Sequence, residues 1–421
     1  MERARGTFGA IPARVLSSAG WLVAGRLFGA SCTVVTLYVT SQHLTEGAFG
    51  RLTFWLAVFL VLDGLVDFGA GQVAVQRSSA SPERLPGLLV TARRARLAMA
   101  ALVVALVATT ALSVEGADAP FLCVAALYQV SHVLELSTLG WRNAIRWRSP
   151  VLVRAGASFA SLVFVLALRS TGESRPLAYL LAIAVGSTLG NVALHTFGRR
   201  GLPSTSGATP EPLAGFLRAS VPIGAAAVCQ QLYFHVDHVF VRALSGDDAV
   251  GHYGVAVRVM SLAIMGGVFA STAALPWLSR AEENGRLLVA ARALCLGTAA
   301  VGAAGALVLW PLRETILGAF GAGFLEAEAA LGWLLVAGAL VHVGAPLLTA
   351  VVAAGAGGAV LGIAAGGLAI NLAGNAWLVP AHGMTGAAAA TVATEAWVAA
   401  AALGFLLRRR PARADVLRTP R

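Results

Sequence analysis

Apolar runs of about 20 residues recur along this 421-residue chain, and they constrain its fold more than any other feature. A helix of that length rises about 30 Å, the thickness of a bilayer's hydrocarbon core. Only 12% of the residues are charged, about half the share of an ordinary soluble domain. The sequence therefore predicts an all-α integral membrane protein with about twelve transmembrane helices. The predicted spans are 15–38, 49–75, 97–114, 120–139, 151–168, 177–197, 216–241, 252–275, 288–310, 331–353, 360–378 and 384–407.

The basic residues predict the orientation of these spans. All 31 are arginines, and arginine is enriched in short cytoplasmic loops. With the N-terminus inside, most arginines fall in inner segments, whereas the outer segments hold few, beside acids such as Glu115 and Asp247. We therefore expect a multi-pass protein of the cytoplasmic membrane with both termini cytoplasmic. Arginines spread along one side, rather than gathered on one module, argue against a nucleic-acid partner.

A polar segment rich in Gly, Pro, Ser and Thr divides the chain near its middle. It predicts an N-terminal six-helix half (1–197), a cytoplasmic linker (198–215), a C-terminal six-helix half (216–407) and a basic cytoplasmic tail (408–421) that contacts membrane lipid. A weak repeat supports the division, because LTEGAFG at 44–50 resembles SGDDAVG at 245–251. Two halves of even helix number lie in the membrane in the same orientation, and such repeats place a substrate path between them. This organisation predicts a transporter.

Charged residues inside the apolar spans are the candidate functional residues, because a charge at membrane depth needs a partner or a cavity. Arg26, near the middle of the first span, is expected to face an interior cavity or an acidic partner. Asp63 and Asp67 share one face of the second helix and either bind a coupling ion or pair with Arg26. In the fourth span His132 and Glu135 also share a face, which an interhelical hydrogen bond explains best.

The stretch QQLYFHVDHVFVR, residues 230–242, places several polar side chains in the seventh span. On a helical wheel a polar stripe is formed by Gln231, His235, His238 and Arg242. Asp237 falls roughly 100° away from that stripe, which argues against a local metal site. The four cysteines also lack zinc spacing, so the sequence predicts no metal and no cofactor. Arg258 in the eighth span and Glu395 in the last are the remaining buried charges of this half.

Four stretches carry a resemblance to a known family. They are LTEGAFGRLTFWLAVFLVLDGLVDFGAGQVAVQR, QQLYFHVDHVFVRALSGDDAVGHYGVAVRV, LPWLSRAEE and GMTGAAAATVATEAW. In order and spacing they are similar to the Wzx-type polysaccharide transporters, the O-antigen and exopolysaccharide flippases of the MOP superfamily. The resemblance implies two six-helix bundles around a central cavity, in a MATE/MOP-like fold. It also implies transfer of an undecaprenyl-diphosphate-linked oligosaccharide to the outer leaflet.

Carried over by position, the resemblance assigns roles to the buried charges. Arg26, Arg258 and the stripe from Gln231 to Arg242 would line the cavity and bind the diphosphate or acidic sugars. Asp237 matches the family's acid in the seventh helix and is expected to pair with Arg258. Arginine suits this task, because its planar guanidinium donates two hydrogen bonds to one phosphate.

Several functions compete at this point. The first is a flippase for a lipid-linked oligosaccharide used in lipopolysaccharide or exopolysaccharide synthesis, with polysaccharide polymerase machinery as a further partner and with ion coupling through Asp63, Asp67, Asp237 or Glu395. The alternative is a MATE-like exporter of small organic cations, which needs acids to dominate the cavity. An embedded glycan polymerase or ligase is disfavoured, because such enzymes generally need a large outer loop. A scaffold has no positive feature to recommend it.

Overall fold

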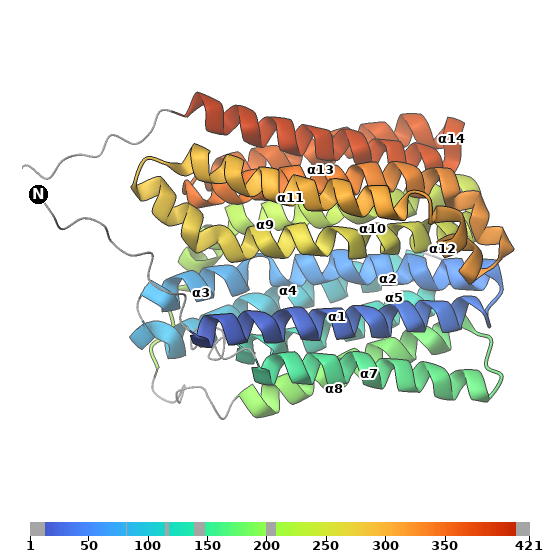
Figure 1. Cartoon of the computed structure of the whole chain (residues 1–421). Helices are drawn as coiled ribbons and strands as arrows, with labels where there is room; N and C mark the ends of the chain where they lie inside the picture. Colours follow the sequence, from blue (N-terminus) through green and yellow to red (C-terminus); the bar gives the residue numbers. More distant parts are fainter. Residues whose placement is uncertain (1–12, 81, 114–117, 139–147, 199–207, 410–421) are drawn as a thin grey trace, which may run out of the picture. The chain divides into compact units, whose positions relative to one another are not determined.

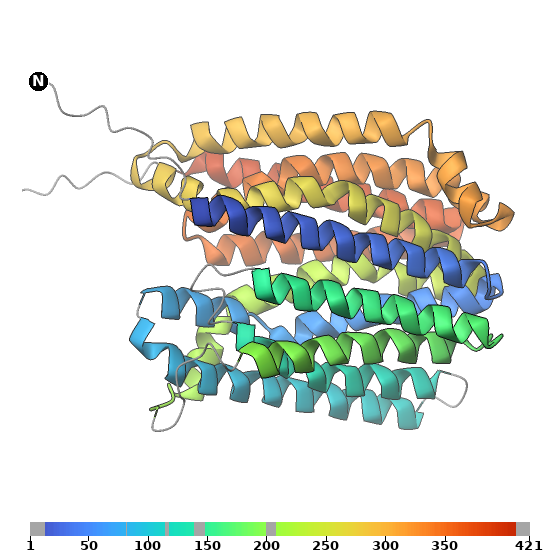
Figure 2. The ribbon, with the colours of Figure 1, turned by 60° about the horizontal axis from the view of Figure 1, so that its bottom comes forward.

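The computed structural model describes residues 13–80, 82–113, 118–138, 148–198 and 208–409. Every element in these ranges is a helix (Figures 1 and 2). In chain order they are α1 (Ala13–Ser41), α2 (Glu46–Asp67), α3 (Ala70–Ala80), η1 (Pro82–Arg84), α4 (Leu85–Ser113), α5 (Ala119–His132), η2 (Val133–Thr138), α7 (Arg148–Ser170), α8 (Pro176–Gly198), α9 (Leu213–His235), α10 (Asp237–Glu283), α11 (Leu287–Leu309), α12 (Arg313–Phe320), η4 (Ala322–Ala327), α13 (Glu328–Ala353) and α14 (Gly357–Arg408). The predicted all-α class is confirmed.

The outward faces of these helices are apolar, as a membrane protein requires. On α11 the side chains of Val289, Leu296 and Leu307 are 70%, 73% and 75% exposed, respectively. Burial of such groups is strongly favourable in water, so their exposure indicates a lipid surrounding. In the part of the chain that the structure describes, eight helical segments are long and apolar enough to cross a membrane. The chain is therefore a multi-pass membrane protein, while the number twelve stays a prediction.

Two long helices are each broken by a glycine with positive φ. At 47 and 52 residues, α10 and α14 would extend about 70 and 78 Å, more than twice a bilayer core. Gly246 (φ 90°) interrupts α10 and Gly383 (φ 54°) interrupts α14. Glycine adopts these angles without the steric cost that a Cβ atom brings. Both breaks fall between predicted spans, so each long helix divides into two of the predicted spans.

The prediction of one continuous second span over 49–75 is wrong. α2 ends at Asp67, and both Phe68 and Gly69 have positive φ, 38° and 73°. The amide of Phe68 donates to the carbonyl of Gly64, which closes the helix end. A Cβ atom at Gly69 would lie 2.8 Å from the amide nitrogen of Gly224. Close backbone packing, which the hydropathy pattern does not record, therefore ends this helix.

The described chain forms two compact units. Unit 1 contains 1–39, 70–173 and 178–217, and unit 2 contains 40–69, 174–177 and 218–421. In unit 1, α4 packs against α5, and in unit 2, α13 packs against α14 and α11 (Figure 1). Notably, α2 belongs to the second unit, where it packs along α10. The division at 197 and 216 remains a prediction about the repeat, and 199–207 and 410–421 of the predicted linker and tail lie outside the described residues.

The two segments of the weak repeat meet inside unit 2. Gly50 of α2 and Gly251 of α10 occupy equivalent repeat positions, 201 residues apart. A Cβ atom at Gly50 would lie 1.7 Å from the carbonyl oxygen of Asp247, and one at Gly251 would lie 3.1 Å from Cα of Gly50. Beside them a Cβ atom at Gly254 would lie 3.1 Å from Cβ of Thr53. Glycine at these positions allows α2 and α10 to touch along their backbones.

Candidate functional site

Arg26 lies in the middle of α1, beside glycines that let α1 pack closely on α7. A Cβ atom at Gly25 would lie 2.1 Å from Cγ1 of Val151, and one at Gly29 would lie 3.4 Å from Oγ of Ser158. Small residues four apart are typical of close helix pairs in membranes. The Arg26 side chain itself is exposed. The packing of α1 on α7 therefore places this arginine beside the first turns of α7.

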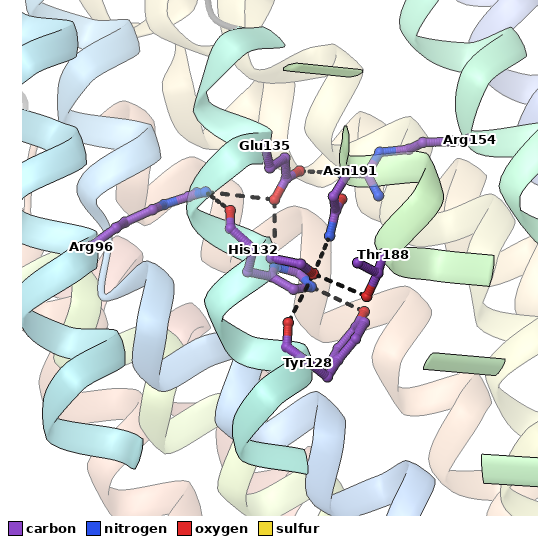
Figure 3. Close-up of polar contacts among 8 residues, drawn as sticks. Arg96, Tyr128, His132, Glu135, Arg154, Thr188 and Asn191 are labelled. Atoms are coloured by element: carbon purple, nitrogen blue, oxygen red, sulfur yellow. Dashed lines mark hydrogen bonds and ion pairs between the residues drawn. The ribbon is translucent and has the colours of Figure 1, made fainter. Parts of the chain in front are cut away.

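Glu135 is the centre of a charged cluster in unit 1 (Figure 3). Arg154 of α7 donates to its Oε1, and Nη1 of Arg96, on α4, lies 3.7 Å from its Oε2. Nδ1 of His132 lies 3.7 Å from the same Oε2. Arg26 lies within electrostatic range of both Arg154 and Glu135. One carboxylate thus gathers basic side chains from several helices.

The backbone around Glu135 is held by neutral hydrogen bonds. His132 Nε2 lies 3.1 Å from the hydroxyl of Tyr128, one turn earlier on α5. The Nδ2 group of Asn191, on α8, donates to Oγ of Ser131 over 3.1 Å, and Thr188 Oγ1 lies 3.5 Å from the same oxygen. The stick view shows these bonds joining the end of α5 to α8 (Figure 3). Ser131 thus makes the interhelical hydrogen bonds to α8, whereas in the predicted pair of His132 and Glu135 it is Glu135 that accepts an interhelical bond, from Arg154 of α7.

Arg96 and Arg154 are not among the site residues that the sequence predicts. The side chain of Arg96 is buried and donates to the carbonyl of His132 over 3.0 Å. Arg154 lies only three residues inside the predicted span 151–168. A charge inside a predicted span is a functional candidate by default. That signal identifies Arg154 from the sequence.

In unit 2 the predicted polar stripe spans the junction of α9 and α10 at Val236. The φ and ψ of Val236, −68° and −23°, are helical, and its amide donates to the carbonyl of Leu232 over 2.8 Å. On α9, Nε2 of Gln231 donates to the carbonyl of Leu60 in α2 over 2.9 Å. The ring of His235 lies within electrostatic range of Arg258, and its Nδ1 atom is buried without a hydrogen-bond partner among the described residues. This part of the stripe is polar and incompletely satisfied.

Asp237 contacts one histidine of the stripe, His238, although it lies roughly 100° from the stripe on the helical wheel. Asp237 begins α10, where its Oδ1 accepts from both the amide and Nδ1 of His238, each over 2.8 Å. Amides in the first turn of a helix lack helical partners, so a carboxylate there can bond a neighbouring one. The hydroxyl of Tyr253 donates to Oδ2 over 2.6 Å. Asp237, His238 and Tyr253 are all buried, and no ion pair between Asp237 and Arg258 is found in the described chain.

The remaining stripe residue, Arg242, belongs to a different contact. Its Nε donates to Oδ1 of Asp247 over 2.6 Å, and its guanidinium carbon lies 4.4 Å from the ring centroid of Phe54. Asp247 also accepts from Arg51 of α2 over 3.3 Å. These contacts lie beside the Gly50 packing, so Arg242 joins α10 to α2 within unit 2.

The predicted coupling residues are distributed over unit 2. Asp63 and Asp67 lie on α2 and are both partly exposed, whereas Glu395 of α14 is 3% exposed. Oε1 of Glu395 is buried without a hydrogen-bond partner among the described residues. Pairing of Asp63 or Asp67 with Arg26 stays a prediction, because Arg26 belongs to unit 1. Within the described ranges no three His, Cys, Asp or Glu side chains gather as a metal ion needs.

Solved structures share this fold. The lipid II flippase MurJ in an inward closed conformation superposes with a TM-score of 0.74 over 93% of this chain and 87% of that one, at 13% identity. An inward-facing multidrug resistance MATE family transporter of the MOP superfamily gives 0.69 over 90% and 93%, at 15% identity. A MOP superfamily transporter from Pyrococcus furiosus, whose binding pocket is described as reversed in polarity, gives 0.68 over 93% and 94%, also at 15%. Identities this low show the fold alone, which is of the MurJ and MATE kind.

Sequence comparison supplies the family. A comparison with curated proteins gives no match. The profile of the polysaccharide biosynthesis protein family matches residues 15–282, well over half of the chain. The matched region contains most of unit 1 and both polar clusters described above, although it ends before Glu395. The resemblance predicted from the sequence is thereby confirmed, and the chain belongs to the polysaccharide biosynthesis protein family.

Proposed function

We propose that this protein is a flippase that moves a polyprenyl-diphosphate-linked oligosaccharide across the cytoplasmic membrane by alternating access. The oligosaccharide is the repeat unit of an O-antigen or exopolysaccharide. Family membership supports a role in polysaccharide biosynthesis, and the fold is one that flippases and transporters use. On this proposal the chain transports its substrate without making or breaking covalent bonds.

The observation that carries the proposal is Arg258. It lies inside α10, and no hydrogen bond or ion pair of its side chain is found in the described chain. An arginine at membrane depth costs about 3 kcal/mol. A chain that keeps such a residue without an internal partner offers a site to an external anion. A lipid diphosphate supplies that anion.

The other predicted site residues divide by what they contact. Arg26 is exposed and suits a phosphate, whereas Gln231 and His235 suit the hydroxyl groups of sugars. His238 and Arg242 are held by Asp237 and Asp247, so we propose that they act only when those contacts rearrange.

The surroundings of the protein follow from the same proposal. We place it in the cytoplasmic membrane with both termini inside, because the arginines of the short loops favour that side. Membrane lipids and polysaccharide polymerase machinery are its proposed neighbours there. Coupling to an ion gradient is proposed through an acid of unit 2, either Asp63, Asp67 or Glu395.

A MATE-like exporter of small organic cations is the second candidate. The fold is compatible with it, and unit 2 buries the acids Asp237 and Glu395. Both oxygens of Asp237 already accept hydrogen bonds from His238 and Tyr253, which leaves Glu395 to bind a cation. Cation-stimulated drug efflux that is lost in Glu395→Gln and retained in Arg258→Ala would favour this candidate over the flippase.

The flippase proposal is tested in cells that depend on this protein for surface glycan. Arg26→Ala and Arg258→Ala should strand lipid-linked oligosaccharide in the inner leaflet and lower surface glycan at least about tenfold, since each removes a charged phosphate contact. Arg169→Ala and Arg292→Ala, at exposed positions of α7 and α11, are matched controls in the two units. Unchanged surface glycan in both test variants, at normal protein level, would refute the assignment of these arginines.

A further inference from the structure

The Glu135 cluster of unit 1 has the composition of an anion site. The guanidinium groups of Arg96 and Arg154 lie against the carboxylate of Glu135, and Arg26 lies within electrostatic range of it. Guanidinium recognises carboxylate and phosphate through the same planar pair of N–H donors. The cluster therefore presents a geometry that either kind of anion fits.

The arginines of the cluster are held to very different degrees. The side chain of Arg96 is 6% exposed, and it also donates to the main-chain carbonyl of His132. The side chain of Arg154 is 49% exposed, and Glu135 is its side-chain partner among the described residues. An exposed ion pair contributes at most about 1 kcal/mol, so it exchanges readily. Arg96 is fixed by the fold, whereas Arg154 is free to change partner.

The location of Glu135 favours such an exchange. It lies in η2, the 3-10 segment that follows the end of α5, and 27% of its side chain is exposed. Arg154 lies in the second turn of α7, close to the loop that the arginine distribution places in the cytoplasm. An anionic head group that arrives from the inner leaflet meets this end of unit 1 first.

We propose that Arg154 and Arg26 form a diphosphate-binding subsite in which the carboxylate of Glu135 occupies the phosphate position until substrate arrives. Arg96 and His132 are positioning residues that hold Glu135 at that place. The inference rests on the proposed flippase function and adds residues to its binding site. It predicts that neutralising Arg154 weakens diphosphate binding, whereas neutralising Glu135 strengthens it. An ion pair with a structural role alone does not produce these opposite effects on binding.

The test measures binding of farnesyl diphosphate to the purified full-length protein in detergent. Arg154→Gln should bind the probe about tenfold more weakly, because a charged hydrogen-bond donor is lost. Glu135→Gln should bind it about threefold more tightly, because the internal competitor for Arg154 is neutral. Arg154→Lys should fall between Arg154→Gln and the wild type, and Arg169→Gln, on the same helix, should match the wild type.

Several outcomes would overturn the subsite. Weaker binding in Glu135→Gln would show that the carboxylate supports the site instead of competing for it, and wild-type binding in Arg154→Gln would remove the subsite altogether. Phosphatidylglycerol that competes as well as farnesyl diphosphate would assign the cluster to phospholipid head groups. Thermal unfolding of each variant shows that it remains folded.

Failure of the proposed function looks different in the same experiment. If Arg258→Gln weakens probe binding and the Arg154 and Glu135 variants do not change it, the subsite is wrong and the flippase proposal stands. If the wild type does not bind the probe at all, the flippase proposal fails together with the subsite.

Discussion

The acids Asp237 and Glu135 each meet a histidine at the end of a helix, yet their surroundings are opposite. Asp237 is 2% exposed, and its two oxygens accept from His238 and Tyr253. Glu135 has a side chain that is 27% exposed and faces arginines, one of them half-exposed. The first acid is enclosed and satisfied, so it stabilises unit 2. The second is partly exposed and pairs with a half-exposed arginine, which agrees with the binding role that we propose for this cluster.

The largest expected effect follows from removing the enclosed acid. Asp237→Ala should lower the free energy of unfolding by about 3 kcal/mol, because the buried ring nitrogen of His238 and the buried hydroxyl of Tyr253 lose their hydrogen-bond acceptor. Glu135→Ala should cost less, because Arg96 keeps its hydrogen bond to the carbonyl of His132 and Arg154 is half-exposed. Thermal unfolding in detergent measures both. Equal losses in the two variants would contradict the contrast between the enclosed and the open acid.

The next largest effect is expected in unit 2, the unit of the enclosed acid Asp237, where α2 packs against α10. Gly50→Ala places a Cβ atom 1.7 Å from the carbonyl oxygen of Asp247, so the backbones must separate. Overpacking of this kind costs about 1–3 kcal/mol. We expect a lower unfolding temperature and reduced transport.

Gly266→Ala is the matched control for this substitution. It lies on the same helix, α10, and a Cβ atom there would meet nothing within 4 Å. An unfolding temperature for Gly50→Ala that equals that of Gly266→Ala would show that the glycine contact does not constrain α2.

The smallest effect is expected at Asp247, an acid of unit 2 that is about as exposed as Glu135. Its side chain is 25% exposed and pairs with both Arg51 and Arg242. Asp247→Asn should lower the free energy of unfolding by about 1 kcal/mol, and the loss should shrink as salt rises. The neighbouring Asp248→Asn, at an exposed position, should have no effect. A loss at Asp247 that does not depend on salt would argue against an electrostatic contact.

Hydropathy predicted the fold class well because it records what a bilayer demands of every residue in a span. It also placed the breaks near Gly246 and Gly383, where the apolar runs are interrupted by polar residues and glycine. It missed the end of α2 at Asp67, because that end depends on the approach of Gly69 to Gly224, far away in sequence. Local patterns do not contain such contacts.

The candidate site shows the same limit. Charges inside spans directed attention to Arg26, Asp237 and Arg258. The contact between Asp237 and His238 was missed, because a helical wheel gives the direction of each side chain and not the bond that two adjacent side chains make. The Glu135 cluster joins side chains from α4, α5, α7 and η2, the 3-10 segment that follows α5. Residue spacing within one helix does not predict a contact among four elements.

Reconstituted flipping tests the central claim most directly. The purified protein is incorporated into vesicles that contain a fluorescent polyprenyl-diphosphate-linked sugar, and a membrane-impermeant quencher reports the fraction of label on the outer leaflet. We predict that the wild type exposes the inner-leaflet pool to the quencher, and that Arg258→Ala slows this exposure at least about tenfold while Arg292→Ala does not. Exposure at the rate of protein-free vesicles for the wild type would contradict the account.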